Sequence, residues 1–366
     1  MKKRLSLKNC IWIILACIFI LIGLIFEGIS QHLIDGLQDQ KLVERWSANG
    51  GWAQISAFFS SDVDVSIETL QNMEYGIGDK LSANSLDNQS ENEGARTIIS
   101  CYSARGVLDL SGKDASVTVE VLGVAGDFFL FHPVELISGA GFNSEEDVND
   151  DYIILDEATA WKLFGSSNVV GQTVMVGEIP LMVAGVAPNG EGRLAKAAGL
   201  SDTLCYVSYN SLVKYGEADH IDTYEVLMPN PVEQYALAEI QTGLGMKEHQ
   251  VEFVENTYRF NLLHRINVIR AFGTRSMNGK AILYPYWENI ARGTEDLVAV
   301  FTLITGIFWI LALTILAVVI TKWWLRNKAG IWQWIKKKII DLPDYIRKVN
   351  RQFKEKVSKG GDVDEV

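Results

Sequence analysis

The chain has 366 residues, of which 48% are hydrophobic and 21% charged, with 7 Pro and 31 Gly. This composition excludes a disordered tail and a collagen-like repeat, and it is sufficient to bury a core. Four Cys residues without a CxxC pair exclude a disulfide-framework scaffold and a zinc ribbon. A net charge of −12 argues against nucleic acid as a partner, because neutralising phosphates requires a basic face.

Charge is distributed unevenly along the chain. Residues 1–9 hold four basic residues and no acid, and residues 322–366 hold 12 basic against 6 acidic residues. The part between them, 10–321, holds 17 basic against 39 acidic residues, a net charge of −22. We therefore expect the two ends and the middle of the chain to lie in different compartments.

Two uncharged apolar runs, Cys10–Phe26 and Leu297–Thr321, mark these changes of charge. A bilayer has a hydrocarbon core of about 30 Å. As a helix the second run is roughly 37 Å long and spans this core. The first run is about 26 Å long, and residues 27–29 can lengthen it. The positive-inside rule then predicts transmembrane helices over 10–29 and 297–321 of a plasma-membrane protein. Both termini would be cytoplasmic and residues 30–296 extracytoplasmic. The alternative for the first run is a cleaved signal peptide, but no A-x-A-like site follows it.

The predicted outer part divides into several segments. Apolar residues at helical spacing predict a stalk helix over 30–50, which ends at a Gly pair. Two related strand, helix, strand modules are predicted within 51–127 and 219–255. Short strands and turns over 128–218 indicate a β-rich unit inserted between them. Six basic residues mark 256–296 as a juxtamembrane connector.

Individual elements are predicted from hydrophobic periodicity and turn residues. The predicted strands are 53–60, 97–104, 116–124, 152–155, 173–176, 180–186, 204–209, 224–229 and 249–255. Helices are predicted over 157–164 and 231–242, and around the apolar positions Ile67, Leu70, Ile77 and Leu81. Gly177-Glu178 predicts a hairpin turn between two of the strands.

The run Asp151–Val186, preceded by Phe131–Val148, resembles the periplasmic core domain of MacB-type ABC transporter permeases. The resemblance covers roughly residues 27–255. Its landmarks occur in the family's order: Gly139 to Phe142, Leu163-Phe164-Gly165, Val170-Gly171-Gln172 and Gly185-Val186.

The resemblance implies an α+β extracytoplasmic domain between two transmembrane α-helices. A split strand-helix-strand porter-like subdomain (51–127 and 219–255) would carry an inserted β-rich subdomain (128–218). Permeases of this family carry four membrane helices, whereas this sequence has two apolar runs, so we expect a shortened, two-span form.

The implied function is that of a non-catalytic membrane subunit. Its extracytoplasmic domain would bind a substrate or a partner and would be coupled to the membrane helices. The partners would be membrane lipids, together with an ABC ATPase and a four-span permease or a second copy of the chain. The alternatives are a membrane-anchored sensor or scaffold without a transport role and, in a third class, an exported enzyme.

No catalytic, cofactor-binding or metal-binding motif is found in the sequence. Ile154–Thr159 (ILDEAT) looks like the acid pair of an ATPase, but no GxxxxGK[ST] loop accompanies it. We interpret Asp156 and Glu157 instead as the first turn of a helix. The acids between 145 and 151 lack EF-hand spacing and indicate a solvated loop. The five His residues are dispersed without an HExxH motif, so we predict no catalytic site, metal or cofactor.

Two of the cysteines, Cys101 and Cys205, lie in the predicted outer part. Disulfides persist outside the membrane, but these cysteines fall in different proposed subdomains and a bond requires closely placed α-carbons. The sequence leaves both the free and the bonded state open.

The tail, 322–366, is a basic amphipathic segment predicted to be cytoplasmic. Its candidate contact residues are Trp332, Trp334, Lys336, Lys337, Lys338, Arg347 and Lys348. Basic amphipathic helices lie on anionic membrane surfaces. The competing interpretation is a helix that docks into an ATPase. We favour the membrane surface, because a Lys-rich polar face with Trp at its edge suits lipid.

Overall fold

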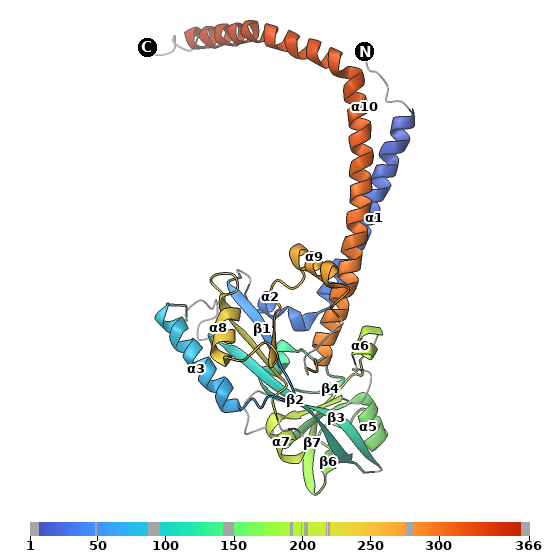
Figure 1. The fold of residues 1–366 in the computed structure, drawn as a ribbon, viewed down its shortest axis with the longest axis vertical. Coiled ribbons are helices and arrows are strands. Elements are labelled where there is room, and N and C mark those ends of the chain that lie inside the picture. The colour runs from blue at the N-terminus through green and yellow to red at the C-terminus, as the bar shows by residue number, and fades with distance from the viewer. Residues whose placement is uncertain are drawn as a thin grey trace, which may run out of the picture. The chain divides into compact units, whose positions relative to one another are not determined.

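The structure is a computed structural model that divides into two compact units, residues 1–28 with 303–366 and residues 29–302. Helices α1 (Leu7–Asp35) and α10 (Tyr286–Lys359) each contribute to both units (Figure 1). The described residues are 7–47, 50–86, 96–113, 115–141, 150–190, 193–198, 200, 204–216, 218, 220–275 and 282–359.

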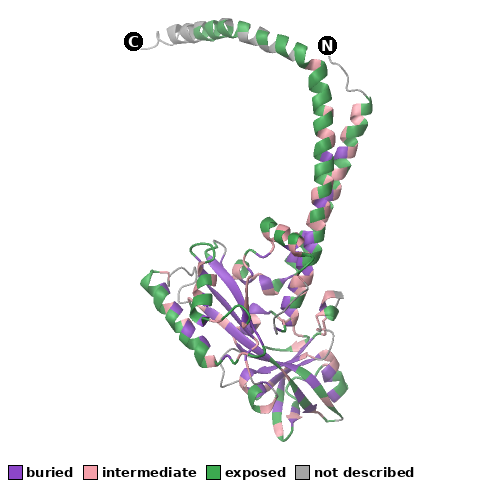
Figure 2. Cartoon of the chain, viewed as in Figure 1, coloured by how far each residue is buried: buried purple, intermediate pink, exposed green. Residues whose placement is uncertain are grey.

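The first unit is a pair of packed apolar helices. The rings of Phe19 and Phe308 lie 5.5 Å apart, and the Thr305 hydroxyl donates to the Gly23 carbonyl at 3.3 Å. Both helices are long and apolar enough to cross a membrane, over Leu7–Asp35 and Tyr286–Gly330. Most of their large apolar side chains are exposed, as Figure 2 shows in green, which suits a surface that faces lipid.

The second unit contains two interleaved strand, helix, strand modules. Their strands lie side by side in the order β10-β1-β9-β2, and all neighbours are antiparallel. This order is that of the ferredoxin-like split fold. The elements are β1 (Trp52–Phe59), α3 (Ile67–Ala83), β2 (Ile99–Ser111), β9 (Thr223–Pro229), α8 (Tyr235–Leu244) and β10 (Val251–Glu255).

The remaining strands extend the same sheet. Strand β3 pairs antiparallel with β2 and parallel with β8, and the sheet continues through β5 and β7 to β4, while β6 pairs with β7 and β2. The strands are β3 (Ser116–Gly126), β4 (Ser138–Gly139), β5 (Tyr152–Asp156), β6 (Thr173–Val176), β7 (Ile179–Ala187) and β8 (Leu204–Ser208). The described strands of 128–218 therefore share one sheet with the two modules.

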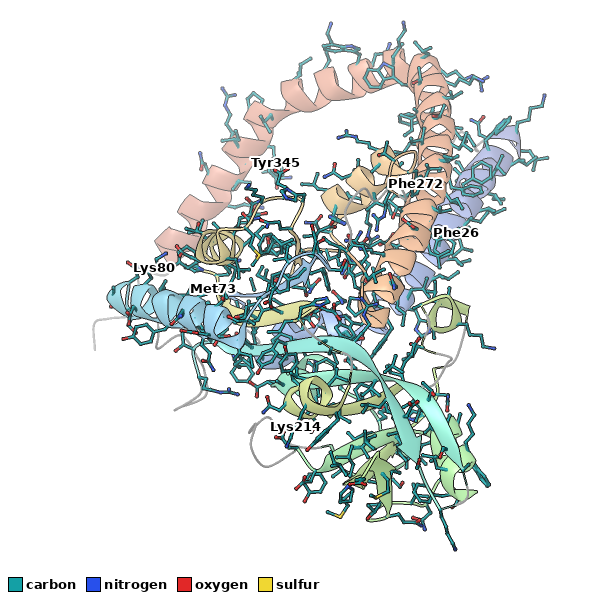
Figure 3. The ribbon with its side chains drawn as sticks, turned by 60° about the horizontal axis from the view of Figure 1, so that its bottom comes forward. Phe26, Met73, Lys80, Lys214, Phe272 and Tyr345 are labelled. Carbon is teal, nitrogen blue, oxygen red and sulfur yellow. The ribbon has the colours of Figure 1, made fainter. Side chains whose placement is uncertain are left out.

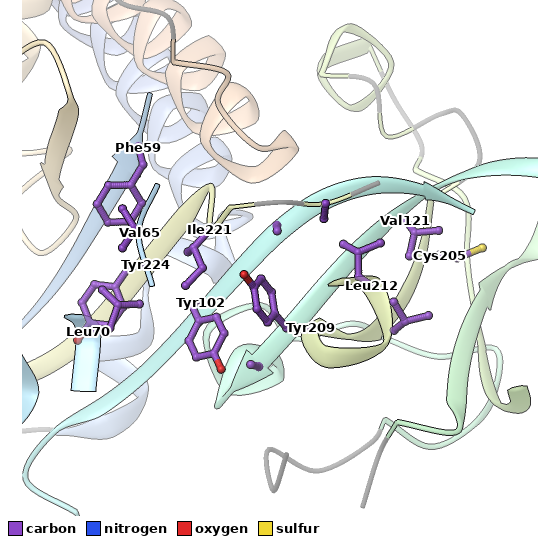
Figure 4. Packing of buried hydrophobic residues seen from close by; sticks show 14 of the residues in the cluster. Phe59, Val65, Leu70, Tyr102, Val121, Cys205, Tyr209, Leu212, Ile221 and Tyr224 are labelled. Atoms are coloured by element: carbon purple, nitrogen blue, oxygen red, sulfur yellow. The ribbon is translucent and has the colours of Figure 1, made fainter. Parts of the chain in front are cut away.

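The sheet separates two apolar cores. The larger core, shown in Figure 4, packs α3, α5 (Glu157–Phe164), α7 (Tyr209–Tyr215) and α8 against one face. Leu212 of α7 packs directly onto Gly123 of β3. A Cβ added at Gly123 would lie 2.7 Å from Leu212 Cδ2, so a side chain at this position would clash with Leu212. The smaller core lies on the opposite face, and its members include Leu42, Trp52, Phe128, Phe131 and Trp287. Alternation along the strands assigns successive residues to the two cores.

Several predicted elements form as expected. Helix α5 has the predicted bounds, because Asp156 caps its start by accepting from the Thr159 amide and Gly165 ends it at φ 68°. The assignment of Asp156 and Glu157 to a helix start is therefore confirmed. Gly177, at φ 63°, supplies the predicted turn between β6 and β7.

The segment 30–50 differs from the expected single helix. Helix α1 ends at Asp35, and a 3-10 turn (Gln38–Gln40) and the short α2 (Leu42–Trp46) follow it. The Gln54 side chain holds this chain reversal, because it accepts from the Leu42 amide and donates to the Asp39 carbonyl at 2.7 Å. Leu42 is buried in the smaller core, so the apolar spacing that predicts a helix reflects packing onto the sheet.

Three other boundaries differ from the prediction. Helix α8 begins at Tyr235 and not at 231, because Gln234 adopts φ 68° and starts the helix later. The connector 256–296 contains α9 (Leu262–Ala271) and the first turns of α10. Helix α10 continues through Pro343 to Lys359 and does not end with the apolar run. The other helices are α4 (Phe128–Phe131) and α6 (Arg193–Ala197).

Candidate functional site

Polar side chains, all buried except the partly exposed Asp39, gather on the sheet face that carries the smaller core. We call them the junction, because they connect the end of α1, the sheet and the base of α10. Its members are Asp39, Gln40, Ser56, His132, Glu225, Asn256, Arg259, Glu288 and Glu295. All of them lie within the unit 29–302.

Strand register aligns the sheet part of the junction. Ser56 of β1 and Cys101 of β2 are both direct cross-strand partners of Glu225 on β9. Directly opposed residues point to the same face, so the three side chains meet there. The Ser56 hydroxyl donates to Glu225 Oε1 at 2.6 Å.

His132 follows α4 and is 0% exposed. Its Nδ1 lies 2.9 Å from Asp39 Oδ1, and its Nε2 contacts Glu225 Oε2. The indole of Trp287, from the first turn of α10, stacks on the imidazole with ring centroids 4.1 Å apart. One side chain thus joins the segment after α1, strand β9 and the base of α10.

The environment of His132 favours its charged form. Burial by itself lowers the pKa of the imidazole, but the charge of Glu225 and hydrogen bonds to Asp39 and Glu225 outweigh this effect. Together they raise the pKa of His132 to about 9. At neutral pH the side chain is therefore an imidazolium held between two carboxylates, with the Trp287 ring against its face.

Within the described ranges, Cys101, His132 and Glu225 form a group that could hold a metal, since their donor atoms lie within 4.8 Å of one another. Both ring nitrogens of His132 already have carboxylate partners, however, so a metal would have to displace one of these contacts. Burial, with a smaller effect of Glu225, raises the pKa of the Cys101 thiol well above its ordinary value. The arrangement therefore fits a buried ion pair better than a metal centre.

Cys101 and Cys205 are both free and buried. Strand β3 lies between the strands that carry them, β2 and β8. Two strand spacings amount to about 9.5 Å, which exceeds the α-carbon separation of a disulfide. Cys101 and Cys205 therefore form no disulfide in the structure, although the sequence left both the free and the bonded state open.

The second part of the junction centres on Arg259, which follows β10. Its guanidinium forms a bidentate pair with Glu288, at 2.6 and 2.8 Å, and its Nε donates to Glu295 at 2.5 Å. All three side chains are buried. Burial alone opposes ionisation of Glu295, but the charge of Arg259 and the His264 ring, whose Nε2 lies 3.3 Å away, hold the pKa of this carboxyl well below its usual range.

Hydrogen bonds connect the two parts of the junction. Asn256 donates to the Ser56 hydroxyl at 2.8 Å and accepts from Arg259 at 3.2 Å, while Ser56 donates to Glu225. Gln40 accepts from Arg259 at 3.1 Å, which adds a second contact to the segment after α1. Because buried ionic partners are costly to separate, the bases of both apolar helices are fixed to the sheet.

A cavity of about 430 Å³ adjoins the junction. Asp39, Glu135, Tyr206 and Tyr286 are among the residues that line it, and the two tyrosine hydroxyls lie 3.2 Å apart. Burial is the main cause that raises the pKa of Tyr206 to about 12, so its hydroxyl stays protonated. The cavity provides room for a small ligand beside the groups that hold α10.

The candidate contact residues of the tail lie on α10. Trp332, Lys336, Arg347 and Lys348 are exposed. The side chains of Trp334, Lys337 and Lys338 lie outside the described part of the chain.

The acids between 145 and 151 are predicted to form a solvated loop. Glu145, Glu146 and Asp147 lie outside the described residues. Asp150 accepts from the Ser208 hydroxyl at 2.7 Å, next to the start of α7.

Comparison with known proteins identifies the family of the chain. We call the unit 29–302 the outer unit. The family model of the MacB-like periplasmic core domain matches residues 14–242. The chain belongs to this family. Proteins with this permease domain are transporter components, and the domain family is not a catalytic one. With two apolar helices, the chain is a membrane protein with an extracytoplasmic MacB-like domain.

Curated relatives share the MacB-like region. The macrolide export ATP-binding/permease protein MacB of Pasteurella multocida is 26% identical over 38% of this chain and 22% of its own length. MacB of Chromobacterium violaceum is 34% identical over 20% of this chain and 12% of its own length. The chain thus covers about a fifth or less of these two relatives.

Solved structures with similarity include two extracytoplasmic domains. The periplasmic region of MacB from Actinobacillus actinomycetemcomitans has a TM-score of 0.39 and 15% identity, covering 61% of this chain and 94% of that one. The extracellular domain of the ABC-type transporter YknZ from Gram-positive bacteria has a TM-score of 0.37 and 16% identity, covering 55% of this chain and 99% of that one.

Proposed function

We propose that the chain is a permease-type membrane component of an ABC transporter. Its outer domain would bind a substrate or a partner, and the junction would couple that event to the two membrane helices. Family membership over residues 14–242 supports the transporter class. The observation that carries the coupling role is the buried contact of His132 and Arg259 with the first turns of α10 and the segment after α1.

The proposed topology has residues 10–29 and 297–321 in the membrane, both termini in the cytoplasm and residues 30–296 outside. The distribution of basic residues supports this orientation. Impermeant thiol labelling of single cysteines at Lys8 and Glu178 in intact cells tests it. Labelling only at 178 supports the proposed orientation, and labelling at 8 contradicts it.

The outer unit divides, in this proposal, into a porter-like part (51–127 and 219–255) and an inserted part (128–218). The four strands β10-β1-β9-β2 with α3 and α8 complete a ferredoxin-like unit without the inserted residues, which supports the division. The tail 322–366 would rest on the cytoplasmic leaflet through its Trp and Lys residues.

An ABC ATPase, with a four-span permease or a second copy of this chain, is the proposed partner. Gentle solubilisation of the tagged full-length protein from its native membrane, followed by affinity purification, tests this proposal. An ABC ATPase or a permease in stoichiometric amount supports it. A homo-oligomer alone contradicts it and favours an anchored sensor or scaffold.

A further inference from the structure

Helix α9 and the turn after it carry apolar side chains on the surface of the outer unit. Leu262 is 62% exposed, Leu263 is 73% exposed, and Phe272, labelled in Figure 3, lies exposed at the end of the helix. In a water-facing helix of a globular protein, the apolar stripe packs against the core. In α9, by contrast, Leu262 and Leu263 point away from the core of the outer unit.

The orientation of α9 follows from its periodicity. Val268 is 3% exposed and marks the face that packs on the domain. At 100° per residue, Leu262, Ile266 and Arg270 fall on the opposite side of the helix. We call this side, with Leu263, the outward face. It combines exposed leucines with an exposed arginine, and no acid occurs between 256 and 287.

Contacts of α9 and its following turn place them beside the start of the second apolar run. Arg275, in that turn, pairs with Glu295 and, at 3.1 Å, with Asp296. His264 also approaches Glu295, at 3.3 Å. Glu295 and Asp296 are the last charged residues before Leu297, where the uncharged run begins. Figure 1 shows α9 next to this part of α10.

The other apolar helix is also close to α9. A cavity of about 240 Å³ is lined by Gln31 and Ile34 from the end of α1 and by Asn261 and Arg265 at the start of α9. The helix therefore lies where both apolar helices leave the expected hydrocarbon region. Arg and exposed Leu or Phe side chains at this depth match an interfacial helix.

We propose that α9 lies in the headgroup region of the extracytoplasmic leaflet. Leu262, Leu263 and Phe272 would enter the boundary with the acyl chains, and Arg270 would contact lipid phosphate. This proposal rests on the topology given under Proposed function. A lipid surface is the occupant because α9 lies beside the end of α1 and the start of the second apolar run, and because its outward face is basic and apolar, without acids.

Depth-dependent quenching in nanodiscs tests the proposal on the full-length protein. Cys10 and Cys17 are replaced by Ser, and the buried Cys101 and Cys205 remain. A polarity-sensitive fluorophore is attached at Leu263→Cys, and the lipids carry a nitroxide at a shallow or a deep position. Because an interfacial helix buries its apolar face by about 5–10 Å, shallow nitroxides should quench this probe about three times more than a water-exposed control.

Two control positions make the result decisive. Val213→Cys, on the exposed side of α7, is the water-facing control, and Leu21→Cys in α1 is the membrane control. Quenching at 21 without quenching at 263 overturns the inference about α9 and leaves the membrane anchoring intact. Absence of quenching at both overturns the topology as well. Blue-shifted emission at 263 without quenching shows that protein covers the outward face, and it also overturns the inference.

Discussion

Arg259 and Glu288 form a bidentate ion pair in which both side chains are buried, with nitrogen to oxygen distances of 2.6 and 2.8 Å. The pair joins the segment after β10 to the first turn of α10. Glu295, seven residues further along α10 and so about two turns away, binds the same guanidinium. The base of α10 is therefore held to the sheet by charge as well as by apolar packing.

Removing Arg259 should destabilise the outer unit strongly. Arg259→Ala leaves Glu288 and Glu295 buried without their cation, and breaking a buried pair in this way costs about 3–5 kcal/mol. Thermal unfolding in detergent measures the effect. The matched control Arg270→Ala, on the exposed face of α9, should change stability by less than about 0.5 kcal/mol. Equal stability of the two variants would contradict the role of the pair.

The charge of His132 makes stability depend on pH. Its folded pKa of about 9 exceeds the ordinary value of 6.5, so its contribution is complete below pH 6.5 and is lost as pH rises through about 9. A shift of this size corresponds to roughly 3 kcal/mol. Unfolding measured between pH 6 and 10 checks this expectation. His132→Gln should flatten the profile, and a wild-type profile that is already flat would show that His132 is neutral.

Truncating Trp287 should open a void next to His132. Trp287 is fully buried, and replacing a buried Trp by Ala costs about 3–5 kcal/mol. Trp161 is 55% exposed on α5, so Trp161→Ala is the control and should cost much less. Denaturant titration of both variants compares them. A loss of similar size in both would argue against close packing at the base of α10.

The buried thiols should be inert until the protein unfolds. In the background with Cys10→Ser and Cys17→Ser, Cys101 and Cys205 remain, and burial raises the pKa of both thiols. Maleimide labelling without reductant should modify neither thiol in the folded state and both after denaturation. Failure to label the denatured protein would indicate a disulfide.

The tail should bind membranes that carry negative charge. A peptide of residues 328–358 should co-sediment with vesicles that contain phosphatidylglycerol and much less with neutral vesicles. Replacing Lys336, Lys337 and Lys338 by Gln should weaken binding by about 3 kcal/mol, at about 1 kcal/mol per lysine. Binding that does not depend on anionic lipid would favour the ATPase-docking interpretation.

Local signals predict much of the fold. Helix α5 and the β6–β7 hairpin form as expected, since a cap and two glycines with positive φ define them within a few residues. Periodicity alone misplaces the segment 30–50. Its apolar residues, Leu42 among them, are spaced for packing of α2 onto the sheet and not along one continuous helix. The start of α8 is also misplaced, because a hydrophobic pattern does not predict the positive φ of Gln234 that delays the helix to Tyr235.

The junction could not be predicted from spacing. Asp39 lies 93 residues before His132, and Glu225 lies 93 residues after it, so the three meet only through the fold. One signal was available in the predicted strand 53–60, where the polar residues Gln54 and Ser56 alternate with apolar ones. Such alternation marks a polar face, but the strand's partner and its register come from the whole sheet.

Hydrogen exchange at the base of α10 tests the coupling role most directly. The natively purified assembly is compared with and without bound ATP, and exchange of residues 286–296 is measured, with α5 (Glu157–Phe164) as internal control. The account predicts that ATP changes protection of 286–296 and of the segment around Asp39, while α5 stays unchanged. Exchange at the junction that is insensitive to ATP, in an assembly that hydrolyses it, would contradict the account.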